Sequence, residues 1–196
     1  MKWFLRIVST ALMVANAHSF EILALGTSNT NCQAGGHAYT NTLNEQLSAQ
    51  GINASVINAG VNGDKPTFML SRLEQALKSH PNIKLVLFEP GPNEQRKRFN
   101  VEYTEKILSY LQDIKMPTIY SSTGAAQTRE EAKMTAQKYG AYYYGHWGRD
   151  VPSDKEHYTF DGVNSASGHM NKTGCTLWAK NTQPLILQVI KDKNIN

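Results

Sequence analysis

The feature that most constrains the fold is a regular alternation of short apolar runs and longer amphipathic segments, which continues from residue 20 to the C-terminus. Short apolar runs bounded by glycine, proline and polar residues are typical of buried strands, which we place at residues 20–25, 54–60, 83–88, 117–122 and 141–145. The intervening segments carry apolar residues at helical spacing, at 38–50, from residue 66 onward, and at 101–111, 128–139 and 171–191.

Strands that alternate with helices along a chain favour an α/β fold, in which a parallel sheet carries helices on both faces. The chain has 196 residues, enough for one compact domain with a sizeable core. The sequence therefore predicts a single α/β domain with five strands, over residues 18–196.

The first 17 residues have a different character. Lys2 and Arg6 precede a short apolar run, and Ala15, Asn16 and Ala17 supply the small-x-small pattern of a signal-peptidase site. We interpret residues 1–17 as a secretory signal peptide, the alternative being a frayed helix. The run is too short to span a membrane, so we expect an exported protein, periplasmic or secreted, with no transmembrane segment.

Export bears on charge and on the two cysteines. Without Lys2 and Arg6 the formal charge falls from +4 to +2, so the basic composition is no argument for a nucleic-acid partner, and we expect none. Cys32 and Cys175 are the only cysteines, and in an oxidising compartment two cysteines suggest one disulfide. The alternative is a pair of buried free thiols.

Polar, glycine-bearing loops follow the first three predicted strands: GTSNT at 26–30, NAGVNGD at 58–64 and EPGPNEQ at 89–95. In parallel sheets, ligands bind at the carboxyl ends of the strands. These three loops are therefore expected to converge on one functional edge. The segment 145–168 is longer than most connections and is a further candidate.

The same loops hold residue types suited to ester hydrolysis through an acyl-enzyme, which needs a nucleophile, a base and oxyanion donors. Ser28 follows a strand, and His169 precedes the last helix and could accept the Ser28 proton. The Gly60 N–H and the Asn93 amide could bind the oxyanion. Each residue has a plain structural reading, as a helix cap, a turn residue or a structural histidine; only their order and positions together are specific.

With these residues in view, the sequence resembles the SGNH (GDSL-like) hydrolases, whose four blocks contribute Ser, Gly, Asn and His in that order. ALGTSNT, NAGVNGD, EPGPNE and HMNKTGCTLWA are similar to the four blocks. The resemblance implies a flavodoxin-like three-layer α/β/α fold and no cofactor or metal. It also implies Ser28 as nucleophile, His169 as base, and the Ser28 N–H, Gly60 N–H and Asn93 as oxyanion donors.

The sequence departs from the family pattern at three positions. Thr27 stands where the first block usually has Asp, and Glu94 replaces Asp in the third block. Ala166 occupies the position three residues before His169, where the family places an orienting Asp.

Two acids remain candidates for that orienting role. Asp161 would reach His169 if the intervening NSASG loops out, and it is our first choice. Asp154 and His157 have the family's Asp-x-x-His spacing, but the sequence after His157 does not match the last block. A backbone carbonyl is the third alternative.

If Ser28 and His169 meet, Cys32 lies about one helical turn beyond the serine and Cys175 lies shortly after the histidine. We therefore predict a Cys32–Cys175 disulfide that joins the two segments.

The sequence thus favours an exported serine esterase acting on small acyl esters, thioesters, lysophospholipids or O-acetyl groups of a glycan. The alternative is a catalytically weak relative that binds a glycan or another envelope component. A glycosidase would need two facing carboxylates, for which Asp64, Glu89 and Glu94 are available.

Overall fold

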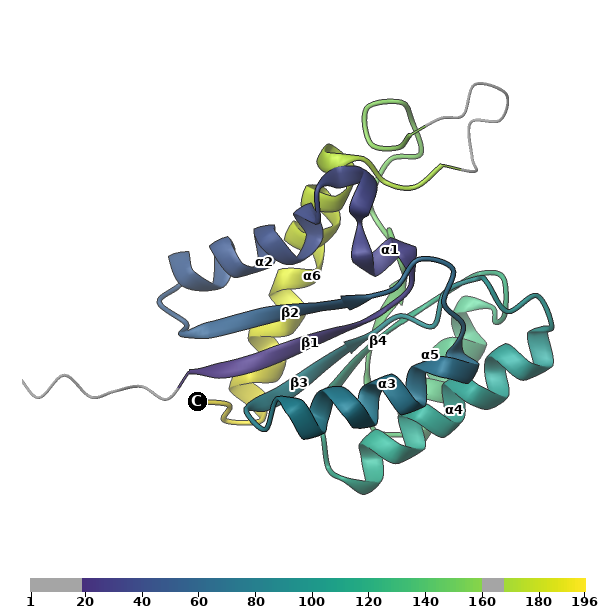
Figure 1. Cartoon of the computed structure of the whole chain (residues 1–196), viewed down its shortest axis with the longest axis horizontal. Coiled ribbons are helices and arrows are strands. Elements are labelled where there is room, and N and C mark those ends of the chain that lie inside the picture. The colour runs from purple at the N-terminus through teal and green to yellow at the C-terminus, as the bar shows by residue number, and fades with distance from the viewer. Residues whose placement is uncertain (1–18, 160–167) are drawn as a thin grey trace, which may run out of the picture.

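The computed structural model describes residues 19–159 and 168–196 and contains one five-stranded parallel sheet in the order β2-β1-β3-β4-β5 (Figure 1). The predicted signal peptide and Asp161 lie outside the described residues. The five predicted strands are all present, as β1 (Phe20–Gly26), β2 (Ala54–Gly60), β3 (Ile83–Phe88), β4 (Thr118–Ser122) and β5 (Tyr142–His146). The predicted parallel α/β fold is confirmed.

Helices cover both faces of the sheet (Figure 1). One face carries α2 (Ala38–Ala49) and α6 (Lys172–Asp192), and the other carries α3 (Pro66–Ser79), α4 (Lys97–Asp113) and α5 (Arg129–Lys138). The molecule is therefore a three-layer α/β/α sandwich.

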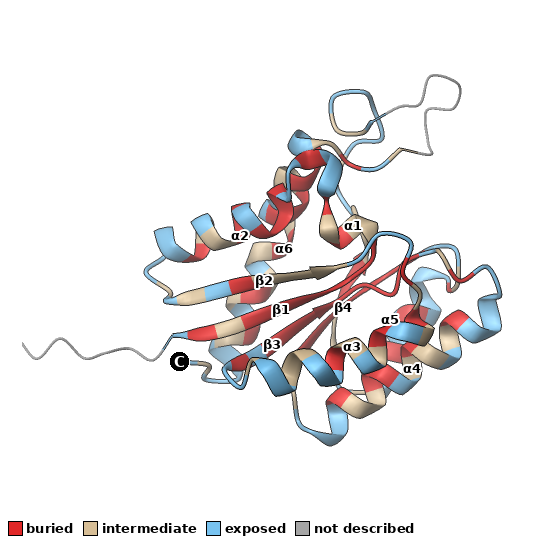
Figure 2. Cartoon of the chain, viewed as in Figure 1, coloured by how far each residue is buried: buried red, intermediate tan, exposed pale blue. Residues whose placement is uncertain are grey.

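The core consists of two clusters, one on each face of the sheet. Successive side chains of a strand point to opposite faces, and β1 follows this rule: Ile22 and Ala24 pack with α2 and α6, whereas Leu23 and Leu25 pack with α3 and α4. All four side chains are fully buried, as expected for a strand covered on both sides (Figure 2).

The structure adds detail that apolar spacing did not reveal. α4 begins at Lys97, four residues before the predicted start, because three of its first four residues are polar and the other one, Phe99, is exposed and adds nothing to the buried apolar stripe. The loop after β1 forms two short helices, α1 (Ser28–Asn31) and the 3-10 helix η1 (Gln33–Gly35). In the described part of the chain, no helix is long and apolar enough to cross a membrane.

The connections place a topological switch point at the carboxyl end of β1. From β1 the chain moves to β2 on one side, and it then returns to β3 on the other side of β1. Ligands of open α/β sheets bind in the crevice that such a reversal creates. The loops after β1, β2 and β3 meet there, as the sequence predicted.

Candidate active site

Ser28 is the first residue of α1, directly after the end of β1. The hydroxyl of Thr27, the residue before it, caps the helix by accepting a hydrogen bond from the Asn29 N–H at 3.4 Å. The Ser28 Oγ lies 2.8 Å from Nε2 of His169, 141 residues further along the chain. Ser28 is half-buried and His169 is exposed, so both are within reach of a ligand.

His169 lies on the segment that enters α6. The His169 carbonyl accepts hydrogen bonds from the N–H and the hydroxyl of Thr159, at 2.8 and 2.9 Å. An isolated antiparallel bridge pairs Tyr158 with Met170, next to the histidine. Asn171 then caps α6 by accepting a hydrogen bond from the Gly174 N–H at 3.1 Å. Backbone bonds on both sides therefore fix the course of the chain at His169.

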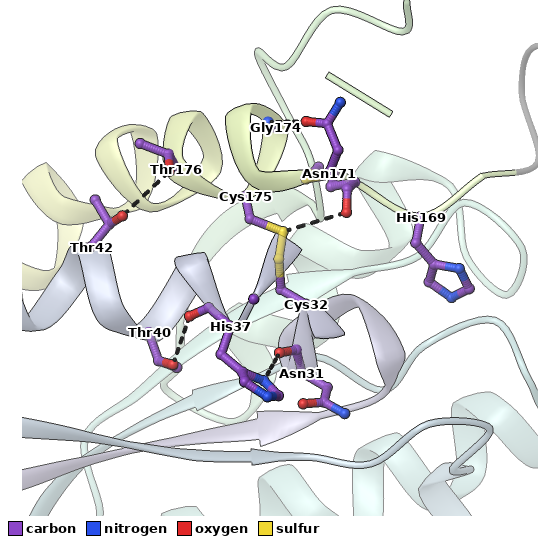
Figure 3. The surroundings of a disulfide bond; sticks show 12 residues. Asn31, Cys32, His37, Thr40, Thr42, His169, Asn171, Gly174, Cys175 and Thr176 are labelled. Atoms are coloured by element: carbon purple, nitrogen blue, oxygen red, sulfur yellow. Dashed lines mark hydrogen bonds between the residues drawn. A yellow bond between two sulfur atoms is a disulfide. The ribbon is translucent and has the colours of Figure 1, made fainter. Parts of the chain in front are cut away.

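The predicted Cys32–Cys175 disulfide is present and joins the segments that carry Ser28 and His169 (Figure 3). Cys32 follows the last residue of α1, and Cys175 lies in the first turn of α6. The half-cystines are 143 residues apart in sequence, and their Cα atoms are separated by 6.5 Å. The disulfide therefore links the two segments close to the contact between Ser28 and His169.

A buried carboxyl group lies beneath the segment that carries Ser28. Glu89 follows β3 and is only 2% exposed. Its Oε2 accepts hydrogen bonds from the Thr27 N–H at 3.0 Å, from the Thr27 hydroxyl at 2.9 Å and from the Thr30 hydroxyl at 3.2 Å. Its Oε1 accepts from the Asn29 side-chain amide at 3.3 Å. Residues on both sides of Ser28 are therefore bound to one side chain from a neighbouring strand.

A cavity of about 540 Å³ opens at Ser28. Residues from all four sequence blocks line it. Its walls are formed by Ser28, Gln33, Ala34, Asn62, Gly63, Asn93 and His169. Asn93 reaches it from the loop after β3, where its Nδ2 donates to the Asp64 carbonyl at 2.9 Å. An amide nitrogen carries two hydrogens, so Asn93 retains a second donor.

The N–H of Gly60, the oxyanion donor expected from the second sequence block, is engaged in a hydrogen bond within the protein. It donates to the Asn58 side-chain oxygen at 3.0 Å, within β2. A side chain at Gly60 would clash with the backbone of Asn31, so this glycine allows α1 to pack directly on β2. Gly63, in the same sequence block, lines the cavity instead and has a positive φ of 73°, which favours glycine.

Arg72 of α3 was not anticipated by the sequence analysis. Its guanidinium donates to the Ala59 carbonyl at 2.8 Å and to the Gly26 carbonyl at 3.2 Å, which ties together the ends of β2 and β1. It also pairs with the Asp64 carboxylate, which follows Gly63 in sequence. In the sequence, Arg72 is one polar residue of an amphipathic helix, and nothing there indicates that it binds the ends of two strands.

The rival histidine is engaged elsewhere. His157 Nδ1 lies 2.6 Å from the Asp154 carboxylate, so these two residues form a local pair, whereas the histidine that meets Ser28 is His169. The hydrogen bond from His157 holds the pKa of the Asp154 carboxyl below its usual value.

The carboxylates considered for a glycosidase are bound within the protein. Asp64 pairs with Arg72, Glu94 accepts from the backbone and side chain of Arg96, and Glu89 binds the segment around Ser28. Among residues 19–159 and 168–196, no group of three or more His, Cys, Asp or Glu side chains is arranged to hold a metal ion.

Comparison with known proteins agrees with this architecture. No protein-family model matches the sequence, and no curated protein matches it. Among solved structures, it is similar to AlinE4, described as an SGNH-hydrolase family esterase, with 24% identity over 88% of this chain and 97% of that one, and a TM-score of 0.63. It is also similar to TesA, with 16% identity over 86% and 99% of the two chains and a TM-score of 0.72.

A third similar structure is the psychrotrophic esterase EstA from Pseudoalteromonas sp., solved with the inhibitor monoethylphosphonate. The identity is 17% over 90% of this chain and 99% of that one, and the TM-score is 0.70. These three likenesses cover between 86% and 90% of this chain. The fold that the sequence motifs led us to expect is confirmed: this chain has the three-layer α/β/α fold of the SGNH hydrolases.

Proposed function

We propose that the protein is a serine esterase that hydrolyses small acyl esters through an acyl-enzyme on Ser28. The observation that carries the proposal is the 2.8 Å contact between Ser28 Oγ and His169 Nε2 at the mouth of a cavity. A serine hydroxyl is a weak nucleophile unless a base at hydrogen-bonding distance accepts its proton. A binding protein has no need of this arrangement.

In the proposed reaction, the Ser28 Oγ attacks the acyl carbonyl carbon while its proton passes to His169 Nε2. The bond between that carbon and the leaving oxygen then breaks, and the imidazolium returns the proton to the leaving alkoxide. Water next attacks the acyl-enzyme, with His169 again accepting the proton. The acid is released and the Ser28 hydroxyl is restored.

The oxyanion formed at each step needs hydrogen-bond donors. We propose the Ser28 N–H, the Gly63 N–H and the free hydrogen of the Asn93 amide. All three residues line the same cavity, and the engaged N–H of Gly60 makes Gly63 the better donor in that block. Asn93 is already oriented by its bond to the Asp64 carbonyl, and a donor held in place before the reaction stabilises charge most effectively.

Asp161 remains the proposed orienting acid for His169, on the resemblance to the family alone. Asp154 is less suited, because it is paired with His157. Loss of an orienting carboxylate leaves residual catalysis from the other groups.

AlinE4 and EstA are esterases, and a further similar structure is a lipase/acylhydrolase from Enterococcus faecalis, which supports an ester substrate. We also propose export, which the Cys32–Cys175 disulfide supports because such bonds persist in oxidising compartments.

Turnover of p-nitrophenyl acetate tests the proposed function. The wild type should release p-nitrophenol, and Ser28→Ala should lose roughly 10⁶-fold in kcat. Ser71→Ala is the matched control, since Ser71 is exposed on α3 and bonds only to the Phe68 carbonyl one turn earlier. A folded wild-type protein with no turnover, or equal turnover by Ser28→Ala, would reject the esterase and favour the binding protein.

A further inference from the structure

We propose that Glu89 is a positioning residue for the nucleophile, acting as an ionised acceptor that binds the chain on both sides of Ser28. The inference rests on the proposed function, because it concerns the same serine. Glu89 does not line the cavity, so any effect on the reaction must pass through Thr27, Asn29 and Thr30.

Glu89 binds most of the short segment that carries Ser28. α1 has four residues, too few to be stable as an isolated helix. Thr27, Asn29 and Thr30 all bond to Glu89, and Ser28 lies between the first two. The segment that carries Ser28 is therefore held by the side chain that directly follows β3, the strand beside β1 in the sheet.

The hydrogen bonds also indicate the charge state. A backbone N–H and an amide NH₂ can only donate at this site, and the Thr27 hydroxyl accepts from the Asn29 N–H and so directs its proton to Glu89. An ionised carboxylate is acceptor-only and suits every one of these partners. A protonated carboxyl would point its own hydrogen toward one of these donors, which cannot accept it.

Thr27 is matched to this carboxylate. The family to which the sequence bears a resemblance usually has Asp at this position, and here the Thr27 hydroxyl lies 2.9 Å from Glu89 Oε2. An aspartate would bring a second carboxylate against the first, and two such groups cannot both ionise cheaply. The hydroxyl of Thr27 therefore suits a position in contact with the Glu89 carboxylate.

Holding the carboxylate in this place is costly. Burial raises the pKa of Glu89, and the hydrogen bonds from Thr27, Asn29 and Thr30 oppose that rise. The buried phenols Tyr39 and Tyr120 lie near the same charge, and burial raises their pKa as well, so both stay neutral. Because the folded-state pKa of Glu89 is raised, its contribution to stability falls as the pH rises from the ordinary value of 4.5 through the folded-state pKa. The ionised acceptor of the proposal is the form present above that folded-state pKa.

The test is Glu89→Gln, which keeps the shape of the side chain and removes the charge. We expect kcat for p-nitrophenyl acetate to fall about 10²-fold with KM little changed, the loss typical of a misplaced reactive group. We also expect the unfolding free energy of the variant, relative to the wild type, to increase with pH above 4.5. A residue that serves stability alone would lose activity only together with folded protein.

Glu105→Gln is the matched control. Glu105 accepts hydrogen bonds at 2.7 Å from Lys138 and Tyr139 between α4 and α5, so its loss should affect stability and leave kcat unchanged. If Glu89→Gln does not fold, Thr27→Val decides, because it removes the hydroxyl that donates to Glu89 and caps Asn29 while keeping the backbone bond from the Thr27 N–H, and it should lower kcat about tenfold at constant KM.

Turnover of p-nitrophenyl acetate by the wild type tests the proposed function. The ratio of variant kcat to wild-type kcat tests the role of Glu89. Should the wild type be inactive, the pH dependence of the stability difference still tests the buried carboxylate. Wild-type kcat in Glu89→Gln, or in Thr27→Val if only that variant folds, would overturn the proposal. A stability difference that still increases with pH at the pH of the activity assay would overturn it as well, because Glu89 would then be protonated there.

Discussion

The two halves of the candidate site are built in contrasting ways. The serine half, residues 26–30, rests on a buried strand end and is bonded to the buried Glu89. The histidine half is exposed, and its known supports are backbone bonds to residues 157–159, the cap of α6 and the disulfide. The first half is fixed by the core of the domain, whereas the second is fixed by contacts between loops.

The contrast shows that strand pairing in the sheet positions the serine half, whereas the histidine half needs constraints outside the sheet. β1 and β3 are adjacent in the sheet, so Glu89 reaches the serine segment by strand pairing alone. His169 approaches from a segment that begins beyond β5, on the far side of the sheet order. The disulfide supplies the covalent link that strand pairing does not provide.

The largest effect should come from removing the histidine itself. His169→Ala should lower kcat by roughly 10⁴- to 10⁶-fold, because Ser28 loses its base. His157→Ala, which removes the paired histidine twelve residues earlier, should stay within about threefold of the wild type. If the two variants exchanged these outcomes, the histidine half would have to be reassigned to Asp154 and His157.

Removing the proposed oxyanion donor on the core-supported half should have the next largest effect. Asn93→Ala should reduce kcat by about 10²- to 10³-fold with a much smaller change in KM, since the donor acts on charge that develops in the transition state. Asn41→Ala serves as control, because Asn41 is exposed on α2 and bonds to the Gly36 carbonyl outside the cavity. Equal kcat in both variants would contradict the assignment.

Breaking the disulfide tests the support of the histidine half. The double variant Cys32→Ala/Cys175→Ala should lose about 2–5 kcal/mol of unfolding free energy, measured by urea denaturation, because the bridge closes a long loop. Reduction of the wild type should have the same effect. A double variant as stable as the wild type would show that loop contacts alone hold His169 beside Ser28.

The smallest effect is expected at Asp154. Because the hydrogen bond from His157 lowers its pKa, Asp154 stabilises the fold above its ordinary value of 3.8, and that contribution is lost as the pH falls through the lowered pKa. Asp154→Asn should therefore lower the melting temperature slightly at neutral pH and not at strongly acidic pH. A tenfold loss of kcat would instead identify Asp154 as the orienting acid.

The sequence predicted the parts of the molecule that depend on local pattern. Apolar runs and helical stripes located every strand of the sheet and the five long helices, and small polar residues at strand ends located the edge where Ser28 and His169 meet. The cysteine pairing followed from that meeting, since Cys32 and Cys175 lie shortly after the two residues.

Other parts depend on contacts that no local pattern encodes. Gly60 and Gly63 occur in one block, and only the backbone shows that the first N–H is engaged and that the second glycine lines the cavity. Glu89 reads as a polar residue after a strand, and its bonds to the nucleophile segment arise from strand order. Arg72 reaches the ends of two strands from a helix on one face of the sheet.

Covalent labelling tests the central claim most directly, because it asks whether Ser28 is an activated nucleophile. The mature protein would be treated with a fluorophosphonate, digested and examined by mass spectrometry. We predict one phosphonylated residue, Ser28, with labelling lost in Ser28→Ala and slowed strongly in His169→Ala. A folded protein that stays unlabelled, or that is labelled at another serine, would contradict the account.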